Sequence, residues 1–281
     1  MKKVGYLGII GLALANIVIW PYVVEGSNLR VTFFDVGQGD AIFIQTPQGH
    51  QMLIDGGPDQ KVVEKVAKVL PFWDKSLDLV VLTHADADHI TGLVSVLEQY
   101  DVGNVLWTGV EKETNIFAAW EQELAQERAN IWIADILQTI LWSKDRSARF
   151  DVVYAAKEAK EINDTSVITK LVFGETSFLF PGDISKNVEQ RLLQEKLAID
   201  ADILKIPHHG SKSSSSEAFL AAVSPYMAVI QVGGQNSYGH PAFEVLERLF
   251  AMGTTTLRTD QNGDIVIEYD SSKGRTNISN Y

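Results

Sequence analysis

The strongest constraint on the fold is an apolar run that leads directly into metal-ligand side chains. Residues 78–82, DLVVL, have the composition of a buried strand, and the residues that follow include His84, Asp86, Asp88 and His89. Such side chains follow a buried strand where a rigid sheet presents its loops to solvent. We therefore expect a sheet whose strand ends carry the functional groups.

Further ligand-type side chains follow other apolar runs in the same way. They are Asp183 in LFPGDIS, His208 and His209 in KIPHHGS, and His240 in NSYGHP. Five of the six histidines thus lie at predicted strand ends. Each residue alone is typical of an ordinary turn, whereas the set together predicts a metal site.

The spacing of the first motif separates its side chains into two pairs. Alternate residues of an extended segment share a side, so His84 and Asp86 point together, while Asp88 and His89 enter a predicted helix. One loop can thus supply two neighbouring metal ions, with Asp183 placed to bridge them. Imidazole and carboxylate ligands suit zinc, iron or manganese, and the large share of oxygen favours manganese. The chain has no cysteine, which excludes thiolate ligands.

The body of the chain alternates between strand-like and helix-like patterns. Several apolar strands precede the helices in each half, which favours a layered α/β architecture with helices covering packed sheets. The hydrophobic content of 46% suits a chain with a sizeable core. We expect a linker at residues 26–29, a single domain at 30–270 and a flexible tail at 271–281.

The N-terminal region carries the signal for compartment. Residues 4–24 contain no charged side chain, and as a helix they would span roughly 30 Å, the thickness of a bilayer core. Lys2 and Lys3 precede them, which predicts an N-terminus inside and a body outside. We expect residues 1–25 to form a single-pass membrane anchor with the catalytic domain outside the cell. The alternative is a cleaved signal peptide and a secreted protein, since Ala13-Leu14-Ala15 resembles a cleavage site.

The formal net charge of −12 limits the possible partners. It argues against extensive duplex binding, because neutralisation of phosphates supplies most of that affinity. Two bound divalent ions would add about four positive charges where the chemistry takes place. The charge is therefore compatible with a phosphodiester substrate.

The ordered motifs of the chain resemble a known family. LTHADADHITGL resembles the H-x-H-x-D-H signature of the metallo-β-lactamase superfamily, with aspartate at the second ligand position. FDVGQGDA, LIDGG, NDTSVITKL, LFPGD, LKIPHHGSKSS and NSYGHP occur around it in an order similar to that of the C-terminal domain of ComEC competence proteins. The resemblance covers residues 30 to 269.

This resemblance implies an αββα sandwich with two divalent metal ions, zinc or manganese, at one edge of its sheets. It places the ligands in the motif and at later strand ends, namely His84, Asp86, Asp88, His89, Asp183 and either His208 or His209. Asp55 matches the aspartate that braces the metal-binding loop. Many members supply a further histidine in the stretch that here holds Asp164, so Asp164 either replaces that ligand or the first metal is held loosely. Gln38 and Asp40 are expected to reach the outer side of the ligands.

The resemblance also implies an exported metal-dependent hydrolase. We interpret it as a phosphodiesterase or nuclease that acts on DNA in competence-type DNA uptake. The expected catalytic residues are Asp88, His208 and His240, the histidines protonating the leaving oxygen unless they ligate metal. We expect four side chains to hold phosphate oxygens, namely those of Lys205, Ser211, Lys212 and Ser213. The alternative for these serines is a flexible loop.

Two other functions remain open. The same site would suit a phosphorylcholine esterase or another phosphodiesterase of the cell envelope, for which Trp107, Trp132, Trp142 and Tyr238 are candidates for an aromatic cage. A non-catalytic, metal-binding accessory of a DNA-uptake channel is the third possibility. ComEC proteins carry a multi-helix channel, whereas this chain has one candidate span, so a separate membrane channel protein is the expected partner.

Overall fold

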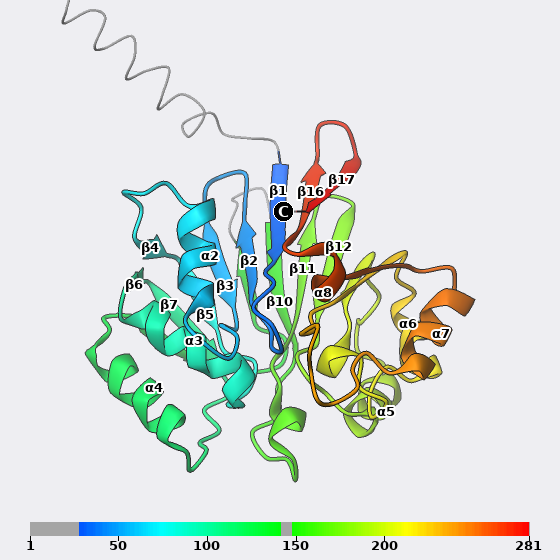
Figure 1. Ribbon diagram of the computed structural model, residues 1–281, viewed down its shortest axis with the longest axis horizontal. Coiled ribbons are helices and arrows are strands. Elements are labelled where there is room, and N and C mark those ends of the chain that lie inside the picture. Colours follow the sequence, from blue (N-terminus) through cyan, green and yellow to red (C-terminus); the bar gives the residue numbers. More distant parts are fainter. Residues whose placement is uncertain (1–27, 142–147, 281) are drawn as a thin grey trace, which may run out of the picture.

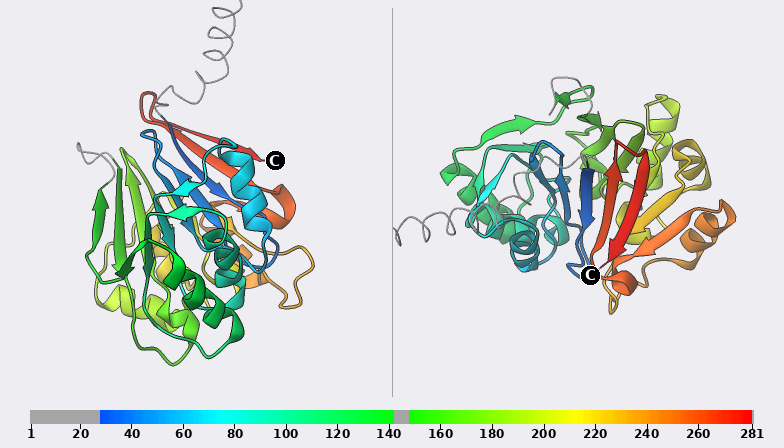
Figure 2. Two further views of the ribbon diagram at one scale, coloured as in Figure 1. Left: turned by 90° about the vertical axis from the view of Figure 1, so that its left-hand side faces the viewer. Right: turned by 90° about the horizontal axis from the view of Figure 1, so that it is seen from above.

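The computed structural model describes residues 28–141 and 148–280. Two large β-sheets stand face to face, and helices cover the outer face of each (Figures 1 and 2). The first sheet has the strand order β17-β16-β1-β2-β3-β5-β7-β8, and the second has the order β15-β14-β13-β12-β11-β10-β9. The described residues therefore form a mixed α/β sandwich with an outer layer of helices on each side.

The strands of the first sheet come from both ends of the described chain. In chain order they are β1 (Asn28–Phe33), β2 (Ile42–Gln45), β3 (Gln51–Ile54), β5 (Leu79–Val81), β7 (Asn104–Trp107), β8 (Asn130–Ile133), β16 (Ile265–Asp270) and β17 (Arg275–Asn280). The strand β1 pairs in antiparallel fashion with β16, so the two halves of the chain meet in one sheet. The short strands β4 (Ser76–Leu77) and β6 (Asp101–Val102) pair separately.

The second sheet is formed by the later half of the chain. Its strands are β9 (Thr139–Leu141), β10 (Ala148–Tyr154), β11 (Ile168–Phe173), β12 (Thr176–Phe180), β13 (Ile203–Lys205), β14 (Met227–Ile230) and β15 (Thr255–Arg258). From β12 to β15 neighbouring strands run parallel, with helices as connections between them.

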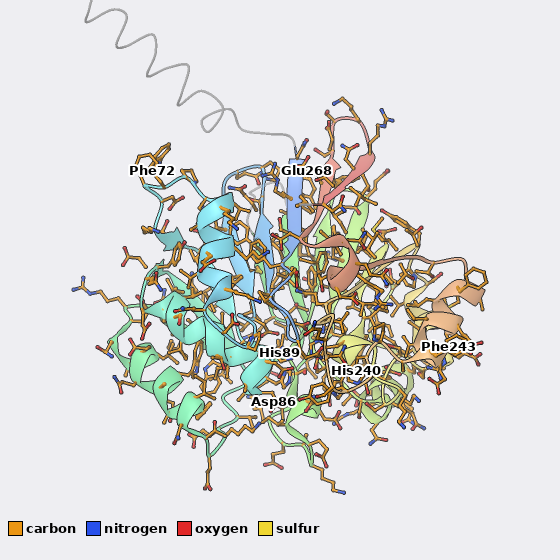
Figure 3. All side chains as sticks on the ribbon, in the orientation of Figure 1. Phe72, Asp86, His89, His240, Phe243 and Glu268 are labelled. Carbon is orange, nitrogen blue, oxygen red and sulfur yellow. The ribbon has the colours of Figure 1, made fainter. Side chains whose placement is uncertain are left out.

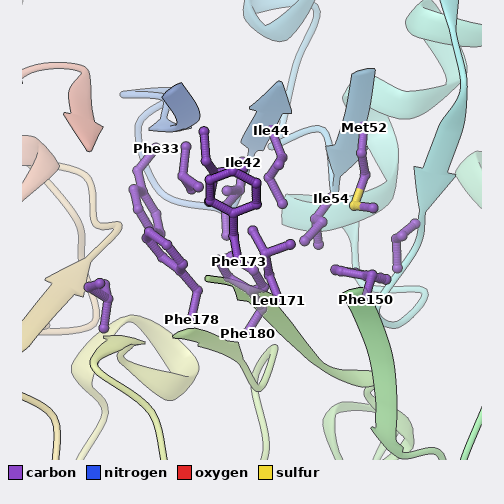
Figure 4. Close-up of a cluster of buried hydrophobic side chains, with 14 of the residues drawn as sticks. Phe33, Ile42, Ile44, Met52, Ile54, Phe150, Leu171, Phe173, Phe178 and Phe180 are labelled. Atoms are coloured by element: carbon purple, nitrogen blue, oxygen red, sulfur yellow. The ribbon is translucent and has the colours of Figure 1, made fainter. Parts of the chain in front are cut away.

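Alternation along the strands builds a core between the sheets. Ile42 and Ile44 of β2 point to the second sheet, whereas Phe43 between them packs under the helices. Figure 4 shows aliphatic and aromatic side chains of the first sheet meeting Phe150, Leu171, Phe173, Phe178 and Phe180 of the second. This packing sets the two sheets rigidly against each other.

Each outer face is covered by its own set of helices. The first sheet carries α2 (Lys61–Val69), α3 (Ala87–Leu97) and α4 (Asn115–Gln126), and the second carries α5 (Lys186–Gln194), α6 (Glu217–Val223) and α7 (Phe243–Ala251). Their apolar faces close two further cores, one outside each sheet. The short α8 (Thr259–Asn262) and the 3-10 turns η1 (Ile162–Thr165) and η2 (Pro207–Gly210) lie in connections.

The directions of the strands define two ends of the molecule. The strands β1, β3, β5 and β7 run the same way, as do β12, β13 and β14, and the loops that follow them meet at one edge. We call this edge the site end. The strand β1 begins and the helix α2 ends at the opposite edge, which we call the distal end. In Figure 3, His89, Asp86 and His240 lie toward one end of the molecule, and Phe72 lies at the other.

Two expectations for the chain termini meet different outcomes. Residues 271–281 were expected to be a flexible tail, but Arg275–Asn280 form β17, because β16 offers them an open edge and pairs with all six residues. Within 28–141 and 148–280 there is no helix long and apolar enough to cross a membrane. The expected anchor at residues 4–24 lies outside those ranges.

Candidate metal centre

The loop after β5 is held in place by one buried carboxylate. Asp55 accepts hydrogen bonds from the Thr83 backbone nitrogen at 2.8 Å and from the Thr83 hydroxyl at 2.7 Å. Its Oδ2 atom also lies 2.8 Å from Nδ1 of His89. Burial raises the pKa of Asp55 although the charge of His89 opposes the shift. Asp55 thus braces the loop, as expected, and turns Nε2 of His89 away from itself.

Close packing between α3 and the loop after β3 positions His89. The Gly56 nitrogen donates to the His89 carbonyl at 2.8 Å, and the Gly92 nitrogen donates to the Gly57 carbonyl at 3.1 Å. A Cβ atom on Gly92 would lie 1.9 Å from the Gly56 oxygen. Only glycine therefore allows the helix to approach this closely.

Four side chains converge at the site end. Candidate ligand atoms of Asp88, His89, Asp183 and His209 all lie within 4.8 Å of one another. Oδ2 of Asp183 lies 3.3 Å from Nε2 of His89 and 3.2 Å from Nε2 of His209. Oδ2 of Asp88 lies 3.2 Å from the same nitrogen of His209. Two residues come from the first sheet and two from the second, so the cluster spans both layers.

The choice between the consecutive histidines is resolved by their surroundings. Both His208 and His209 have left-handed backbone angles, with φ values of 51° and 53°. The ring of His209 is buried, and its Nδ1 atom donates to the Gln231 carbonyl at 2.9 Å, so Nε2 is left to face the cluster. His208 instead lines the pocket outside, with Nδ1 at 3.5 Å from the Ser213 hydroxyl. The geometry brings His209 into the cluster, and not His208.

His84 and Asp86 form a second pair beside the cluster. Nε2 of His84 lies 3.7 Å from Oδ2 of Asp86, and the ring centroids of His84 and His89 are 4.1 Å apart. Nδ1 of His84 lies 3.0 Å from the Thr83 hydroxyl. The other carboxylate oxygen of Asp86 makes an ion pair with Lys112. The two pairs expected from the spacing are therefore arranged side by side.

Unsatisfied buried nitrogens support metal ligation. Nε2 of His84 is buried and has no hydrogen-bond partner in the part of the chain that the structure describes, and the buried Nε2 of His89 meets only the carboxylates of Asp183 and Asp88, at 3.3 and 4.0 Å. Buried polar atoms are rarely left in this state without a reason. The donor set of imidazole nitrogens and carboxylate oxygens thus fits divalent metal ions.

A buried lysine lies beneath the carboxylates. Nζ of Lys205 lies 3.0 Å from Oδ1 of Asp183 and 3.1 Å from the Gly182 carbonyl, and it also makes an ion pair with Asp40. Burial would lower the pKa of Lys205, but the charges of Asp183 and Asp40 outweigh it and raise that pKa. Lys205 was expected to hold substrate. That expectation is wrong, because its side chain is only 1% exposed and is engaged by the carboxylates.

The cluster has a distinct charge state when no ion is bound. Burial would lower the pKa values of His89 and His209, but Asp183 and the neighbouring carboxylates hold both well above their ordinary value. The pKa of Asp183 is well below its ordinary value because His209 and Lys205 outweigh the effect of burial. Burial dominates at His84, whose pKa is lowered well below the ordinary value.

The remaining expected residues fall into two groups. Asp40 lies below the cluster, with Oδ1 at 3.4 Å from Nδ1 of His209, and the side-chain oxygen of Gln38 accepts from the Gly233 nitrogen at 3.2 Å. Asp164 is not brought into the cluster, because η1 directs its carboxylate to the Ser185 nitrogen at 3.0 Å. Its neighbour Asn163 lines the pocket instead.

The serine run is ordered and is largely occupied by its own contacts. The hydroxyls of Ser211 and Ser213 lie 2.8 Å apart, and the Lys212 carbonyl accepts from the side chain of Lys186 at 2.7 Å. Further along, Glu189 accepts from the Ser216 nitrogen at 2.9 Å. The expectation of a flexible loop is therefore wrong. Lys212 and Ser213 are exposed, whereas Ser211 is buried.

An open pocket of about 200 Å³ lies over the cluster. Tyr238 and His240 form one wall, with stacked rings 5.7 Å apart, and the His208 ring is 5.7 Å from His240. Burial lowers the pKa values of His208 and His240. The pocket is lined by Gln38, Asp86, Asp88, Asn163, Asp183, His208, His209, Tyr238 and His240.

Two supporting residues escaped the sequence reasoning. The Gln231 carbonyl orients His209, and the Gln231 side chain donates to the Phe34 and Ala41 carbonyls of the first sheet at 3.1 and 2.9 Å. The Ser166 hydroxyl lies 3.4 Å from Nδ1 of His84. No pattern around Gln231 signals its role, whereas Ser166 belongs to the NDTS motif and could have been considered.

Comparisons with known proteins agree with this geometry. The family model described as the metallo-beta-lactamase superfamily matches residues 34–233. ComE operon protein 3 of Bacillus subtilis (strain 168) is 31% identical over 92% of this chain and 35% of its own length. Competence protein ComA of Neisseria gonorrhoeae is 30% identical over 90% of this chain and 34% of its own length. Both relatives are ComEC-like, and the chain spans about a third of the length of each.

A solved structure supports the fold alone. The metallo-beta-lactamase fold protein YhfI from Bacillus subtilis superposes with a TM-score of 0.57 at 11% identity. The match covers 85% of this chain and 99% of that protein.

Proposed function

The chain belongs to the metallo-beta-lactamase superfamily, and we propose that it is an exported phosphodiesterase that cleaves DNA during competence-type DNA uptake. The observation that carries the proposal is the convergence of Asp88, His89, Asp183 and His209 beneath an open pocket, which all of them except His89 line. Members of this superfamily are generally metal-dependent hydrolases. One of the relatives is named competence protein ComA, and on this basis we take DNA as the substrate.

Two divalent ions, zinc or manganese, are the proposed cofactors. Asp88, His89, Asp183 and His209 would hold one ion, and His84 and Asp86 would hold the other with help from Asp183. Bound there, the ions supply Lewis acidity and an activated water molecule. The remaining residues must then orient the substrate and move protons.

Proton transfer to the leaving oxygen is assigned to the pocket wall. The half-buried rings of His208 and His240 stand beside the cluster, and Nδ1 of His240 is buried with no hydrogen-bond partner among the described residues. Burial lowers the pKa values of both rings and favours their neutral forms. A bound anionic phosphodiester would raise these pKa values again and so favour the protonated rings that can donate a proton. Lys212 and Ser213 are exposed beside this wall and are the proposed contacts to phosphate oxygens.

The aromatic residues near the site favour a nucleotide over a choline headgroup. Trp107 packs against Trp120 in the core outside the first sheet, with ring centroids 6.5 Å apart. Trp132 packs on the core between the sheets, and residue 142 lies outside the described ranges. Tyr238 lines the pocket and is 70% exposed. A single exposed ring can stack on a base, whereas a choline cage needs several rings.

The proposed setting is the outer face of a membrane. The uncharged stretch at residues 4–24 would anchor the chain or direct its export. We propose that a separate membrane channel protein admits the DNA at this face.

The test uses the full chain in detergent micelles. Single-stranded DNA, duplex DNA and a phosphorylcholine ester are each incubated with Mn²⁺, Zn²⁺ or a chelator. The variants are Asp88→Ala and His209→Ala. His50→Ala is the matched control, because His50 lies in the turn between β2 and β3, near Asp78 and away from the cluster.

The outcomes separate the three functions. Metal-dependent DNA cleavage that is lost in both site variants and kept in His50→Ala supports the proposal. Cleavage of the choline ester alone would replace DNA with a cell-envelope substrate. Stoichiometric metal binding without turnover of any phosphodiester would make the protein a non-catalytic accessory.

A further inference from the structure

The distal end of the folded body exposes two adjacent aromatic side chains. Phe72 and Trp73 come shortly after α2, which ends at Val69, and they are 84% and 52% exposed. Their rings pack edge to face, with centroids 4.8 Å apart. Figure 3 shows Phe72 at the end of the molecule opposite His89 and His240. Aromatic rings of this kind concentrate at the interface between membrane and water.

A basic groove runs along the same helix. It has a volume of about 510 Å³, and Arg30 of β1 and Lys65 and Lys68 of α2 contribute its cations. Arg30 pairs with Glu268, and Lys65 pairs with Asp264. Lys68 is exposed and makes no ion pair with any described residue. The groove thus carries an uncompensated positive charge on a chain whose net charge is −12.

The acidic group next to the aromatic pair, Asp74, is hydrogen-bonded by neutral side chains. Asp74 accepts from the Gln51 side chain and the Ser76 hydroxyl, both at 2.7 Å. The nearby Lys75 lies 4.9 Å from the Tyr100 ring centroid. The exposed carboxylate of Asp101 also lies here, beside Ser76 in the pairing of β4 with β6, so the cations that face lipid phosphates are those of the basic groove.

The length of chain before β1 limits the distance from the proposed anchor. Residues 4–24 carry no charge, and only residues 25–27 separate them from Asn28, where β1 begins. Three extended residues span at most roughly 10 Å. If residues 4–24 lie in a bilayer, as proposed above, the distal end is held at its surface.

We propose that the distal end docks on the surface of an anionic lipid bilayer. Phe72 and Trp73 enter the interfacial layer, and Arg30, Lys65 and Lys68 face the lipid phosphates. The metal cluster at the site end then faces away from the membrane. This inference rests on the proposed anchor and does not depend on the hydrolytic activity.

The test places a fluorescent probe on the full chain. The chain has no cysteine, so Phe72→Cys can carry a single polarity-sensitive fluorophore. Phe243→Cys is the matched control, because Phe243 is 69% exposed at the start of α7, on the side of the site end. Both labelled chains are reconstituted into phosphatidylcholine vesicles, with and without phosphatidylglycerol. Spin-labelled lipids serve as quenchers.

Docking predicts a different response at the two positions. We expect blue-shifted emission and strong quenching at position 72 in vesicles that contain phosphatidylglycerol, and an aqueous spectrum at position 243. Lys68→Glu should weaken the response at position 72, whereas Lys157→Glu on an exposed loop should not. An aqueous spectrum at position 72, or equal spectra at both positions, would overturn the proposal.

Two further measurements test the role of the basic groove and separate docking from DNA cleavage. Equal responses at position 72 in neutral and anionic vesicles would overturn the role assigned to the basic groove. DNA cleavage is measured on the same preparations, so failure of the proposed activity and failure of docking are read independently.

Discussion

At the scale of single residues, Lys205 sets the charge balance beneath the cluster. Its ammonium group lies between Asp40 and Asp183, and all three side chains are buried. Removal of one partner from a buried ion pair leaves a charge without compensation, which is strongly destabilising. A bound divalent ion near Asp183 supplies positive charge to the same carboxylate.

The first prediction concerns the variant Lys205→Met. We expect it to lower the free energy of unfolding of the metal-free chain by about 3–5 kcal/mol, and by less when Mn²⁺ is present. Urea unfolding with and without metal measures both values. Lys65→Met is the control, since its more accessible ion pair with Asp264 is worth only about 0–1 kcal/mol. An equal loss with and without metal would contradict this account.

The second prediction concerns protons. Burial opposes the charged form, but Asp183 and its neighbours raise the pKa values of His89 and His209 well above the ordinary value, which favours protonated rings in the metal-free chain. A pKa raised by folding stabilises the chain below the unfolded value of about 6.5, and this contribution is lost as the pH rises through the folded value. Metal-free stability should therefore fall above pH 7.

Metal binding requires neutral imidazoles, so it should release about one proton or more per chain at pH 7. Calorimetric titration in two buffers with different ionisation enthalpies counts the protons. His209→Ala should release fewer. Identical heats in both buffers would show that the rings are already neutral.

The residue types of the site could be predicted from the sequence, but their partners could not. His84, Asp88, His89 and Asp183 follow strands, and that pattern is local. The choice between His208 and His209 depends on the Gln231 carbonyl, which belongs to another strand. Lys205 was misjudged from its proximity to PHHGS, although alternation along β13 places it on the same face as the core residue Ile203.

At the scale of elements, the helix α3 is the part whose position matters most. It begins at Ala87 and carries Asp88 and His89 in its first turn, and glycines let it approach the loop after β3. Any displacement of α3 therefore moves two candidate ligands together. The helix itself was evident from the sequence. Its close packing against the loop after β3 was not, because Gly56 and Gly92 are far apart along the chain.

The third prediction is that Gly92→Ala harms both stability and metal affinity. The added Cβ would overlap the Gly56 oxygen, and relief of such overpacking typically costs about 1–3 kcal/mol. Because α3 must shift, we expect the metal affinity to fall at least about tenfold. Thermal unfolding and metal titration measure the two effects. Ser95→Ala, on a half-buried position of the same helix, should change neither, and a Gly92→Ala chain with unchanged metal affinity would argue against this geometry.

Element boundaries were less accessible to sequence reasoning than element types. The tail residues Arg275–Asn280 form a strand only because β16 presents an edge to them. The serine run takes its shape from Glu189, which lies on α5 and is remote in sequence. In both cases a long-range partner decides the local conformation.

At the scale of the whole molecule, the cluster joins the two sheets. Asp88 and His89 belong to the side of the first sheet, and Asp183 and His209 belong to the second. The Gln231 side chain adds hydrogen bonds across the same junction. An ion bound by all four side chains would be released by separation of the two layers.

The fourth prediction is therefore a metal-dependent gain in thermal stability. At a metal concentration of 100 times Kd, binding to the folded state contributes about 2.7 kcal/mol, which corresponds to a rise in Tm of roughly 5–10 °C. Calorimetric scans with Mn²⁺ and with a chelator measure the difference. Asp88→Ala should show a much smaller shift. A wild-type Tm that is unaffected by the chelator would mean that the ions do not hold the layers together.

The pairing of β1 with β16 has a consequence for biosynthesis. A nascent polypeptide cannot complete the pairing of β1 with β16 until residue 270 has left the ribosome, because Asn28 pairs with Asp270. Until then β1 has a vacant hydrogen-bonding edge that is prone to intermolecular pairing. Chaperone binding during synthesis should consequently concentrate on β1 and β2, and a chain that stalls before β16 should be a target for proteolysis.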